Sequence, residues 1–244
     1  MKDFELTDEE MQMYLHKIEI DITESCNLAC VSCVRGCNIF KSDVMISLDK
    51  IRKFVDESIE LNYQWERIGI MGGEPTVHPQ LPEIINILYE YHVFNPSCQF
   101  WTRSNCIIPY EFPDWIEYQK NPDHSHHHAF YVSPQDVGFP MNKRACHVLY
   151  DCGLMYSHHG YLPCCNSNVH IRAFNLIDGV QSLKNVNYES MMKLCHIYCR
   201  HCGMYMMDNF ESGYLLSYPV DYISETWQNA LIKYNSINCR KTRV

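Results

Sequence analysis

Long apolar runs are missing from this sequence: no stretch approaches the ~18 consecutive apolar residues of a membrane-spanning helix. The first residues, MKDFELTDEE, are acidic and lack the apolar core of a secretory signal, so we expect a cytoplasmic protein without a membrane anchor. Positive charge is scarce as well, because 20 Lys and Arg stand against 29 Asp and Glu. The formal net charge of −9 argues against a general binder of nucleic acid or of anionic membranes. Internal repeats are also absent, and 244 residues predict one domain or one domain with a small appendage.

Cysteine, by contrast, is abundant, with 14 residues. A chain of this length can bury a core of its own, and without a secretion signal the thiols do not indicate a disulfide framework. Clustered and regularly spaced thiols then predict metal or iron–sulfur ligation. Most of them form an N-terminal run and a C-terminal field, namely Cys26, Cys30, Cys33 and Cys37, and Cys146, Cys152, Cys164, Cys165, Cys195, Cys199 and Cys202.

The first half of the chain alternates short apolar runs with helical patterns. We expect strands over 18–22, 67–71, 99–104 and 129–133, helices after Ser47 and over 79–91, and a closing helix over 221–234. This alternation predicts an α/β fold with a parallel sheet covered by helices, either open or closed into a barrel. Ligands of such sheets bind beyond the carboxyl ends of the strands, where the first two strands carry their unusual motifs.

The first motif, Cys26-x3-Cys30-x2-Cys33, places three thiols directly after the first strand. Three protein ligands on a four-iron cluster leave one iron open for a substrate or cofactor, as in a catalytic zinc site. The spacing is neither that of a zinc finger nor that of a ferredoxin. It resembles the CxxxCxxC signature of the radical SAM superfamily. The resemblance implies a 4Fe-4S cluster that binds S-adenosylmethionine (SAM), and a 5′-deoxyadenosyl radical that abstracts a substrate hydrogen; an unrelated zinc protein is the alternative.

A second motif follows the second strand and is similar to the GGEP element of the same family, which holds the amino group of SAM. Adjacent glycines let the backbone approach a ligand closely, and a carboxylate pairs with an ammonium. The end of the third strand resembles the ribose-binding region, and Ser133 is a similar candidate, although a plain strand-end cap or turn explains these residues equally well. The resemblance thus implies cofactor binding by Gly72, Gly73, Glu74, Pro75, Ser104, Asn105 and Ser133.

Two residues of the first motif depart from the family or lie outside its signature. Ser32 stands where the family usually has an aromatic residue near the adenine, so adenine contact must come from the backbone or from another side chain such as Phe40 or Trp101. Cys37 lies outside the signature, and we do not count it as a ligand.

The C-terminal cysteine field resembles the auxiliary-cluster region of the SPASM/twitch subgroup, with Gly160 turning a hairpin just before Cys164. Few cysteines follow Cys202, which implies the twitch arrangement with one auxiliary 4Fe-4S cluster. A zinc ribbon that only stabilises this region is the alternative. The resemblance assigns Cys152, Cys164, Cys199 and Cys202 as ligands, with Cys146 as the first substitute, Cys165 as a bystander and Cys195 left open.

The length between the two cysteine regions limits the barrel. About 110 residues separate Cys33 from Cys146, too few for six βαβ units of roughly 30 residues. We therefore expect a partial barrel of the radical SAM type, with four or five strands, over 1–140. An auxiliary-cluster region over 141–210 and a closing helix within 211–244 complete the predicted domain organisation.

The resemblance to compact twitch-type dehydrogenases implies the reaction. We expect oxidation of a secondary alcohol on a sugar or cyclitol-like small molecule, with the auxiliary cluster as electron acceptor and an external donor such as flavodoxin or ferredoxin. Two alternatives stay open: a peptide- or protein-modifying radical SAM enzyme that forms a thioether, a crosslink or an epimer, and a non-enzymatic, metal-stapled binding protein. The sequence does not identify a catalytic acid or base.

Overall fold

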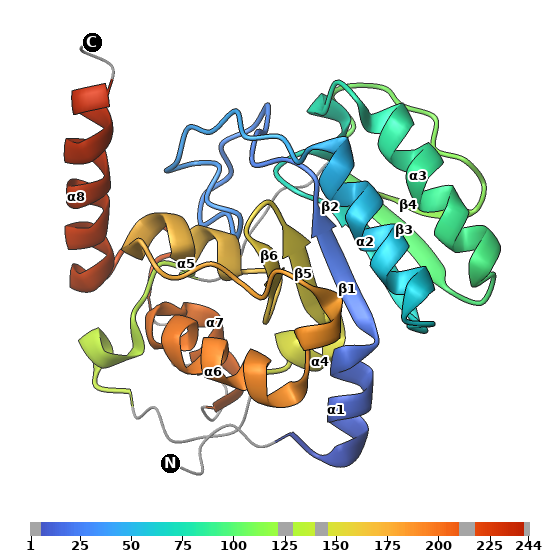
Figure 1. The fold of residues 1–244 in the computed structure, drawn as a ribbon. Coiled ribbons are helices and arrows are strands. Elements are labelled where there is room, and N and C mark those ends of the chain that lie inside the picture. The colour runs from blue at the N-terminus through green and yellow to red at the C-terminus, as the bar shows by residue number, and fades with distance from the viewer. Residues whose placement is uncertain (1–5, 122–128, 140–145, 210–217, 242–244) are drawn as a thin grey trace.

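The computed structural model describes residues 6–121, 129–139, 146–209 and 218–241. Its centre is a six-stranded sheet with the order β4-β3-β2-β1-β5-β6 (Figure 1). All neighbouring strands are parallel except β5 and β6, which form an antiparallel hairpin. The strands are β1 (Lys17–Asp21), β2 (Arg67–Met71), β3 (Gln99–Ser104), β4 (Ile116–Lys120), β5 (Leu154–Ser157) and β6 (Gly160–Leu162).

Helices cover this sheet, and two of them, α2 and α3, have the apolar spacing from which they were predicted. Ser47 caps α2 by accepting a hydrogen bond from the Lys50 amide, and α2 buries Phe54 and Val55 against the sheet. Helix α3 lies beside α2, and both cover the strands of the N-terminal half (Figure 1). The helices are α1 (Asp8–Leu15), α2 (Leu48–Glu60), α3 (Leu81–Phe94), α4 (Val148–Cys152), α5 (Ser167–Phe174), α6 (Tyr188–Tyr198), α7 (Gly203–Asn209) and α8 (Glu225–Lys241), with 3₁₀ helices at Pro75–Val77, Pro134–Val137, Leu183–Asn185 and Cys199–His201.

The α/β class is confirmed, and the described part of 1–140 contributes four strands, β1 to β4, to an open sheet of six. β2 and β3 form at the predicted residues, and β1 begins one residue early. The predicted strand at 129–133 is wrong. This segment is buried but pairs with no described strand, because the Ser32 hydroxyl accepts from the Phe130 amide (2.7 Å). The carbonyls of Phe130 and Tyr131 accept from the amides of Gly203, at the start of α7, and of Ser224.

The fourth strand of the sheet is instead β4, which the sequence analysis missed. β4 is an edge strand, and only its first residue, Ile116, is buried. Its polar composition, Ile-Glu-Tyr-Gln-Lys, follows from this position, since an edge strand needs few apolar side chains.

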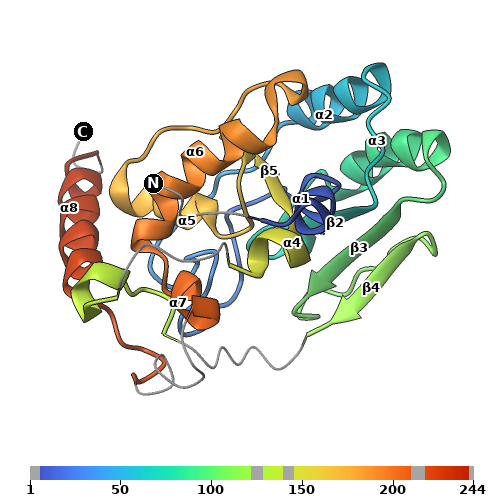
Figure 2. The same cartoon turned by 90° about the horizontal axis from the view of Figure 1, so that it is seen from below.

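The C-terminal half completes the same sheet. The predicted hairpin at Gly160 forms, and β5 pairs with β1. Helix α8 begins at Glu225, later than expected, and lies at the opposite end of the molecule from β4 (Figure 2). The predicted boundaries at 140/141 and 210/211 fall outside the described residues, so the three-part division stays a prediction. Among the described helices, none is both long and apolar enough to span a membrane.

Candidate functional site

The first cysteine motif lies in a loop that follows β1, and we call residues 26–37 the Cys loop. A hydrogen bond from the Cys37 thiol lowers the pKa of Cys26, and contacts of Cys37 with Cys26 and Cys33 raise its own pKa. Burial, followed by the charges of Cys33 and Cys26, raises the pKa of Cys30. The three thiols of the signature are thus close neighbours. Cys37, which we had not counted, lies among them.

The GGEP segment packs directly on the start of this loop. The amide of Gly73 donates to the Thr23 carbonyl (2.8 Å), and the amide of Glu74 donates to the Ser25 carbonyl (2.9 Å). A Cβ atom on Gly73 would lie 2.1 Å from the Ser25 oxygen, and one on Gly72 would lie 2.5 Å from the Thr23 oxygen. Both positions therefore require glycine, and the close approach that requires it is between two protein segments.

Glu74 then links the end of β2 to the end of β3. Its side chain is buried, and its two oxygens accept from Ser104 Oγ (2.8 Å), from the Asn105 amide (2.8 Å) and from Thr76. Asn105 extends this chain toward the Cys loop, since its Nδ2 donates to Asn27 Oδ1 at 2.6 Å. The same nitrogen lies 4.0 Å from Cys26 Sγ. Three segments far apart in the sequence thus meet beside Cys26, while protein donors occupy the Glu74 carboxylate.

The other predicted cofactor residues lie at different positions. Pro75, the last residue of the GGEP segment, is the first residue of the 3₁₀ helix Pro75–Val77. Ser133 is buried, and its amide donates to Ser224 Oγ (3.0 Å) just before α8. Of the two aromatic candidates for adenine contact, Phe40 lines a pocket beside the Cys loop, whereas Trp101 lies on the sheet between Arg67 and Arg103.

That pocket has a volume of about 410 Å³. It opens between the two ends of the Cys loop and the residues that follow it, and its lining is mostly polar. The lining residues are Glu24, Ser25, Cys26, Cys37, Phe40, Lys41, Ser42 and Asp43.

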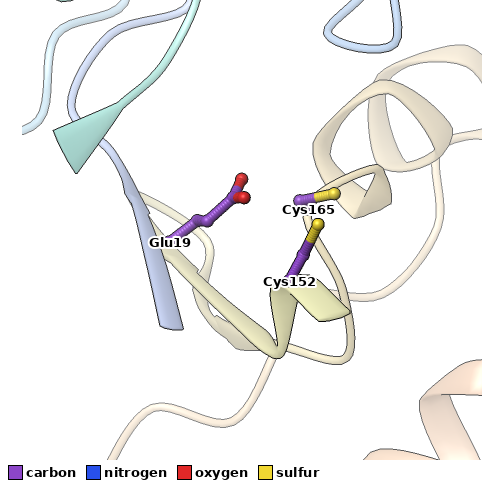
Figure 3. A group of neighbouring side chains, drawn as sticks. All are labelled: Glu19, Cys152 and Cys165. Carbon is purple, nitrogen blue, oxygen red and sulfur yellow. The ribbon is translucent and has the colours of Figure 1, made fainter. Parts of the chain in front are cut away.

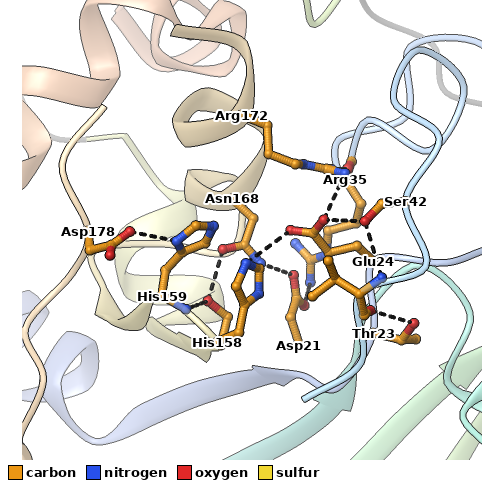
Figure 4. A network of polar contacts seen from close by, with 12 residues as sticks. Asp21, Thr23, Glu24, Arg35, Ser42, His158, His159, Asn168, Arg172 and Asp178 are labelled. Carbon is orange, nitrogen blue, oxygen red and sulfur yellow. Dashed lines mark hydrogen bonds and ion pairs between the residues drawn. The ribbon is translucent and has the colours of Figure 1, made fainter. Parts of the chain in front are cut away.

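A buried charged network lies behind the pocket, along β1 (Figure 4). Arg35 of the Cys loop pairs with Glu19 (2.6 Å) and with Asp21 (3.1 Å). Asp21 also accepts from Asn168 Nδ2, and burial raises its pKa to about 7. These residues were not predicted from the sequence, although the alternation Ile-Glu-Ile-Asp-Ile over 18–22 indicates a strand with one acidic face. One face of β1 is apolar, and the acidic face points into the protein.

The C-terminal cysteines converge from three elements. Hydrogen bonds join Cys165 to Cys152 and Cys199 to Cys195. Desolvation, with smaller contributions from the charges of Cys165, Cys199 and Cys202, raises the pKa of the partly buried Cys164. The four predicted ligands are therefore neighbours, together with Cys195 and with Cys165, the expected bystander. Cys165, Cys152 and Glu19 place one ligand atom each within 4.8 Å of one another (Figure 3). Cys146 is buried just before α4.

Known proteins resemble this chain in part of the sequence and in the fold. No family model matches it. It is 37% identical to the probable GTP 3′,8-cyclase of Methanococcus vannielii over 71 residues, which are 29% of this chain and 23% of that protein. The corresponding protein of Methanococcus maripaludis is 34% identical over 74 residues, 30% of this chain and 24% of that protein. The chain thus matches about a quarter of the length of these curated relatives.

The crystal structure of BtrN in complex with AdoMet and 2-DOIA has the same fold, with a TM-score of 0.52 and 14% identity over 77% of this chain and 92% of that one. The likeness to BtrN shows the fold, and the partial likeness to the cyclases agrees with the resemblance of the Cys and GGEP motifs to the radical SAM superfamily. The donor sets fit the cofactors of that superfamily. Three neighbouring thiols beside a pocket suit a cluster with one open iron, and the converging C-terminal thiols exceed the four that a second cluster needs.

Proposed function

We propose that this protein is a radical SAM enzyme of the twitch type that oxidises a secondary alcohol of a sugar or cyclitol-like small molecule. The observation that carries the proposal is twofold: the GGEP segment bonds to Thr23 and Ser25, which lead into the Cys loop, and Asn105 contacts Cys26 and Asn27 of that loop. These contacts lie at the edge of the sheet where β1, β2 and β3 end. Parallel sheets bind ligands at this edge. The BtrN structure, which holds AdoMet and 2-DOIA, supports a small-molecule substrate.

The residues of this chain take defined roles in the proposal. Cys26, Cys30 and Cys33 hold the SAM-binding cluster, and Asn105 faces the ribose. Because protein donors occupy the Glu74 carboxylate, we assign the amino group of SAM to the main chain of residues 72–75. Glu74 and Ser104 then act as positioning residues that fix this main chain relative to Cys26. Ser133 is the least supported of the predicted cofactor residues, because its amide donates to Ser224 and not to any of this set.

The C-terminal cysteine field would hold the acceptor for the electron that the substrate loses. We assign one auxiliary 4Fe-4S cluster to Cys152, Cys164, Cys199 and Cys202. When bound, the two clusters supply the one-electron reduction that cleaves SAM and an acceptor for the electron released as the alcohol becomes a ketone. A small cytoplasmic donor such as flavodoxin or ferredoxin would deliver the first electron.

Iron, sulfide and zinc counts on anaerobically reconstituted protein test this proposal, together with Mössbauer and EPR spectra. We expect about eight irons per chain in the wild type and about four in the Cys26→Ala/Cys30→Ala/Cys33→Ala variant. That variant should release no 5′-deoxyadenosine from SAM, whereas Cys199→Ala/Cys202→Ala should release it without oxidising any alcohol. About four irons falling to none, with one zinc retained, would replace the auxiliary cluster by a structural zinc site and end the dehydrogenase proposal.

A further inference from the structure

Three side chains outside the cysteine sites bring metal-ligand atoms together. Glu24 follows β1, and His158 and His159 form the turn between β5 and β6. One carboxylate oxygen and one ring nitrogen from each histidine all lie within 4.8 Å of one another. Figure 4 shows these three side chains grouped beside the charged network of β1. From this arrangement we infer that Glu24, His158 and His159 bind a divalent transition-metal ion of the zinc or ferrous type.

The Glu24 carboxylate is oriented for such a role. Its Oε2 accepts from Ser42 Oγ (2.7 Å) and from Arg172 Nη1 (3.2 Å). Its Oε1 has no hydrogen-bond partner among the described residues, although the side chain is only 6% exposed. A buried carboxylate oxygen without a donor is costly, so an ion at this oxygen removes a penalty that the protein otherwise bears.

His159 has the hydrogen bonding that is typical of a metal-bound histidine. Its Nδ1 lies 2.6 Å from Asp178 Oδ1, so this nitrogen carries the proton and the lone pair is on Nε2. That Nε2 is buried and has no partner among the described residues. A carboxylate that accepts from the second ring nitrogen is the usual outer partner of a histidine ligand.

The separation of His158 and Glu24 also suits a shared ion. His158 Nε2 lies 3.7 Å from Glu24 Oε1, too far for a hydrogen bond. Two ligands at about 2.1 Å from one tetrahedral zinc ion lie roughly 3.4 Å apart, so a small adjustment brings both into place.

The surrounding contacts hold the turn in place and balance its charge. Lys50 Nζ donates to the His158 carbonyl (2.7 Å), and the His159 amide donates to Ser157 Oγ (3.1 Å). The positive charges of Lys50 and Arg172 disfavour a cation at this site, and the negative charges of the Glu24 and Asp178 carboxylates compensate for them. Two imidazoles and one carboxylate select zinc or ferrous ion over magnesium or calcium, and they leave a coordination position open.

Zinc binding to the full chain tests this site without any assay of activity. The protein is first loaded anaerobically with its iron–sulfur clusters, so that the cysteines are occupied, and is then titrated with chelator-buffered Zn²⁺. We expect one zinc per chain, with ligands at about 2.0–2.1 Å in zinc X-ray absorption spectra and no sulfur near 2.3 Å. His159→Ala should abolish this binding, and Asp178→Asn should weaken it roughly 10- to 100-fold.

His16→Ala is the matched control, because the His16 ring contacts the Gln64 carbonyl and the Tyr63 ring near the opposite end of β1. It should bind zinc like the wild type. The iron content of every variant reports whether it folds. If His159→Ala does not retain iron, Asp178→Asn decides, since Asp178 is largely exposed and its loss leaves the core intact. A sulfur shell around zinc, or unchanged affinity in Asp178→Asn, overturns the inference.

Discussion

Gly73 shows, at the scale of a single residue, how tightly the two N-terminal motifs are packed. A Cβ atom at this position would lie 2.1 Å from a backbone oxygen that cannot move without displacing the Cys loop. We expect Gly73→Ala to lower the free energy of unfolding by about 3 kcal/mol, the upper range for overpacking. It should also prevent loading of the N-terminal cluster. Urea unfolding and iron counts measure both effects.

Gly138→Ala is the control for this substitution. Gly138 has a φ of +72° but open space around its Cβ position, so only backbone strain of about 1–2 kcal/mol opposes an alanine there. Full iron loading is expected in this variant. If the two alanine variants have equal stability and equal iron content, the contact between the motifs does not require glycine.

Asp21 gives stability a dependence on pH, because burial raises its pKa to about 7. The unfolded chain releases this proton near the ordinary pKa of an aspartate, about 4. The contribution of Asp21 is therefore fully present below pH 4 and is lost as the pH rises through 7. Between pH 5 and 6.5 we expect the wild type to lose about 1 kcal/mol per pH unit relative to Asp21→Asn. Parallel pH profiles of the two proteins would contradict this prediction.

At the scale of elements, the sequence was informative where one local pattern decides the outcome. The cap at Ser47 and the apolar spacing of α2 are sufficient to predict that helix, and the same holds for the apolar strands β2 and β3. Burial alone does not make a strand, as the segment 129–133 shows. Its backbone groups form hydrogen bonds with the Ser32 side chain and with the amides of Gly203 and Ser224, and not with any strand that the structure describes.

The candidate site likewise has one part that the sequence predicts and one part that it does not. The thiols of the Cys loop and the GGEP segment are recognisable because each motif is continuous in the sequence. The group of Glu24, His158 and His159 is not, since more than 130 residues separate its two parts and only the pairing of β5 with β1 brings them together. No local pattern carries that information.

The adjacent residues Cys164 and Cys165 provide a test at the scale of elements, because both follow β6 and face other cysteines. Desolvation and the charges of nearby thiols, Cys199 and Cys202 among them, raise the pKa of Cys164. The thiol of Cys165 is hydrogen-bonded to the thiol of Cys152. We expect Cys164→Ala to reduce the iron content from about eight to about four per chain, while Cys165→Ala keeps about eight. Cys98→Ala, at an isolated buried thiol, is the control. The reverse pattern would make Cys165 the ligand.

At the scale of the whole molecule, one side chain joins the two cysteine regions. Arg35 extends from the Cys loop, pairs with Glu19 and Asp21 of β1, and donates to the Cys165 carbonyl in the C-terminal field. All three charged side chains are buried. The relative position of the two proposed clusters therefore depends on a charge group in the core of the sheet, and removing the arginine leaves two carboxylates unpaired.

We expect Arg35→Met to lower the free energy of unfolding by about 3–5 kcal/mol, the usual cost of breaking a buried ion pair. Adding Glu19→Gln and Asp21→Asn removes the unpaired charges and should recover most of that loss, because the penalty lies in the carboxylates. Arg52→Met, at an exposed pair with Glu90, should cost less than about 1 kcal/mol. Urea unfolding of the four proteins measures these differences. If the triple variant is as unstable as Arg35→Met, shape and not charge is what Arg35 contributes at the centre of the molecule.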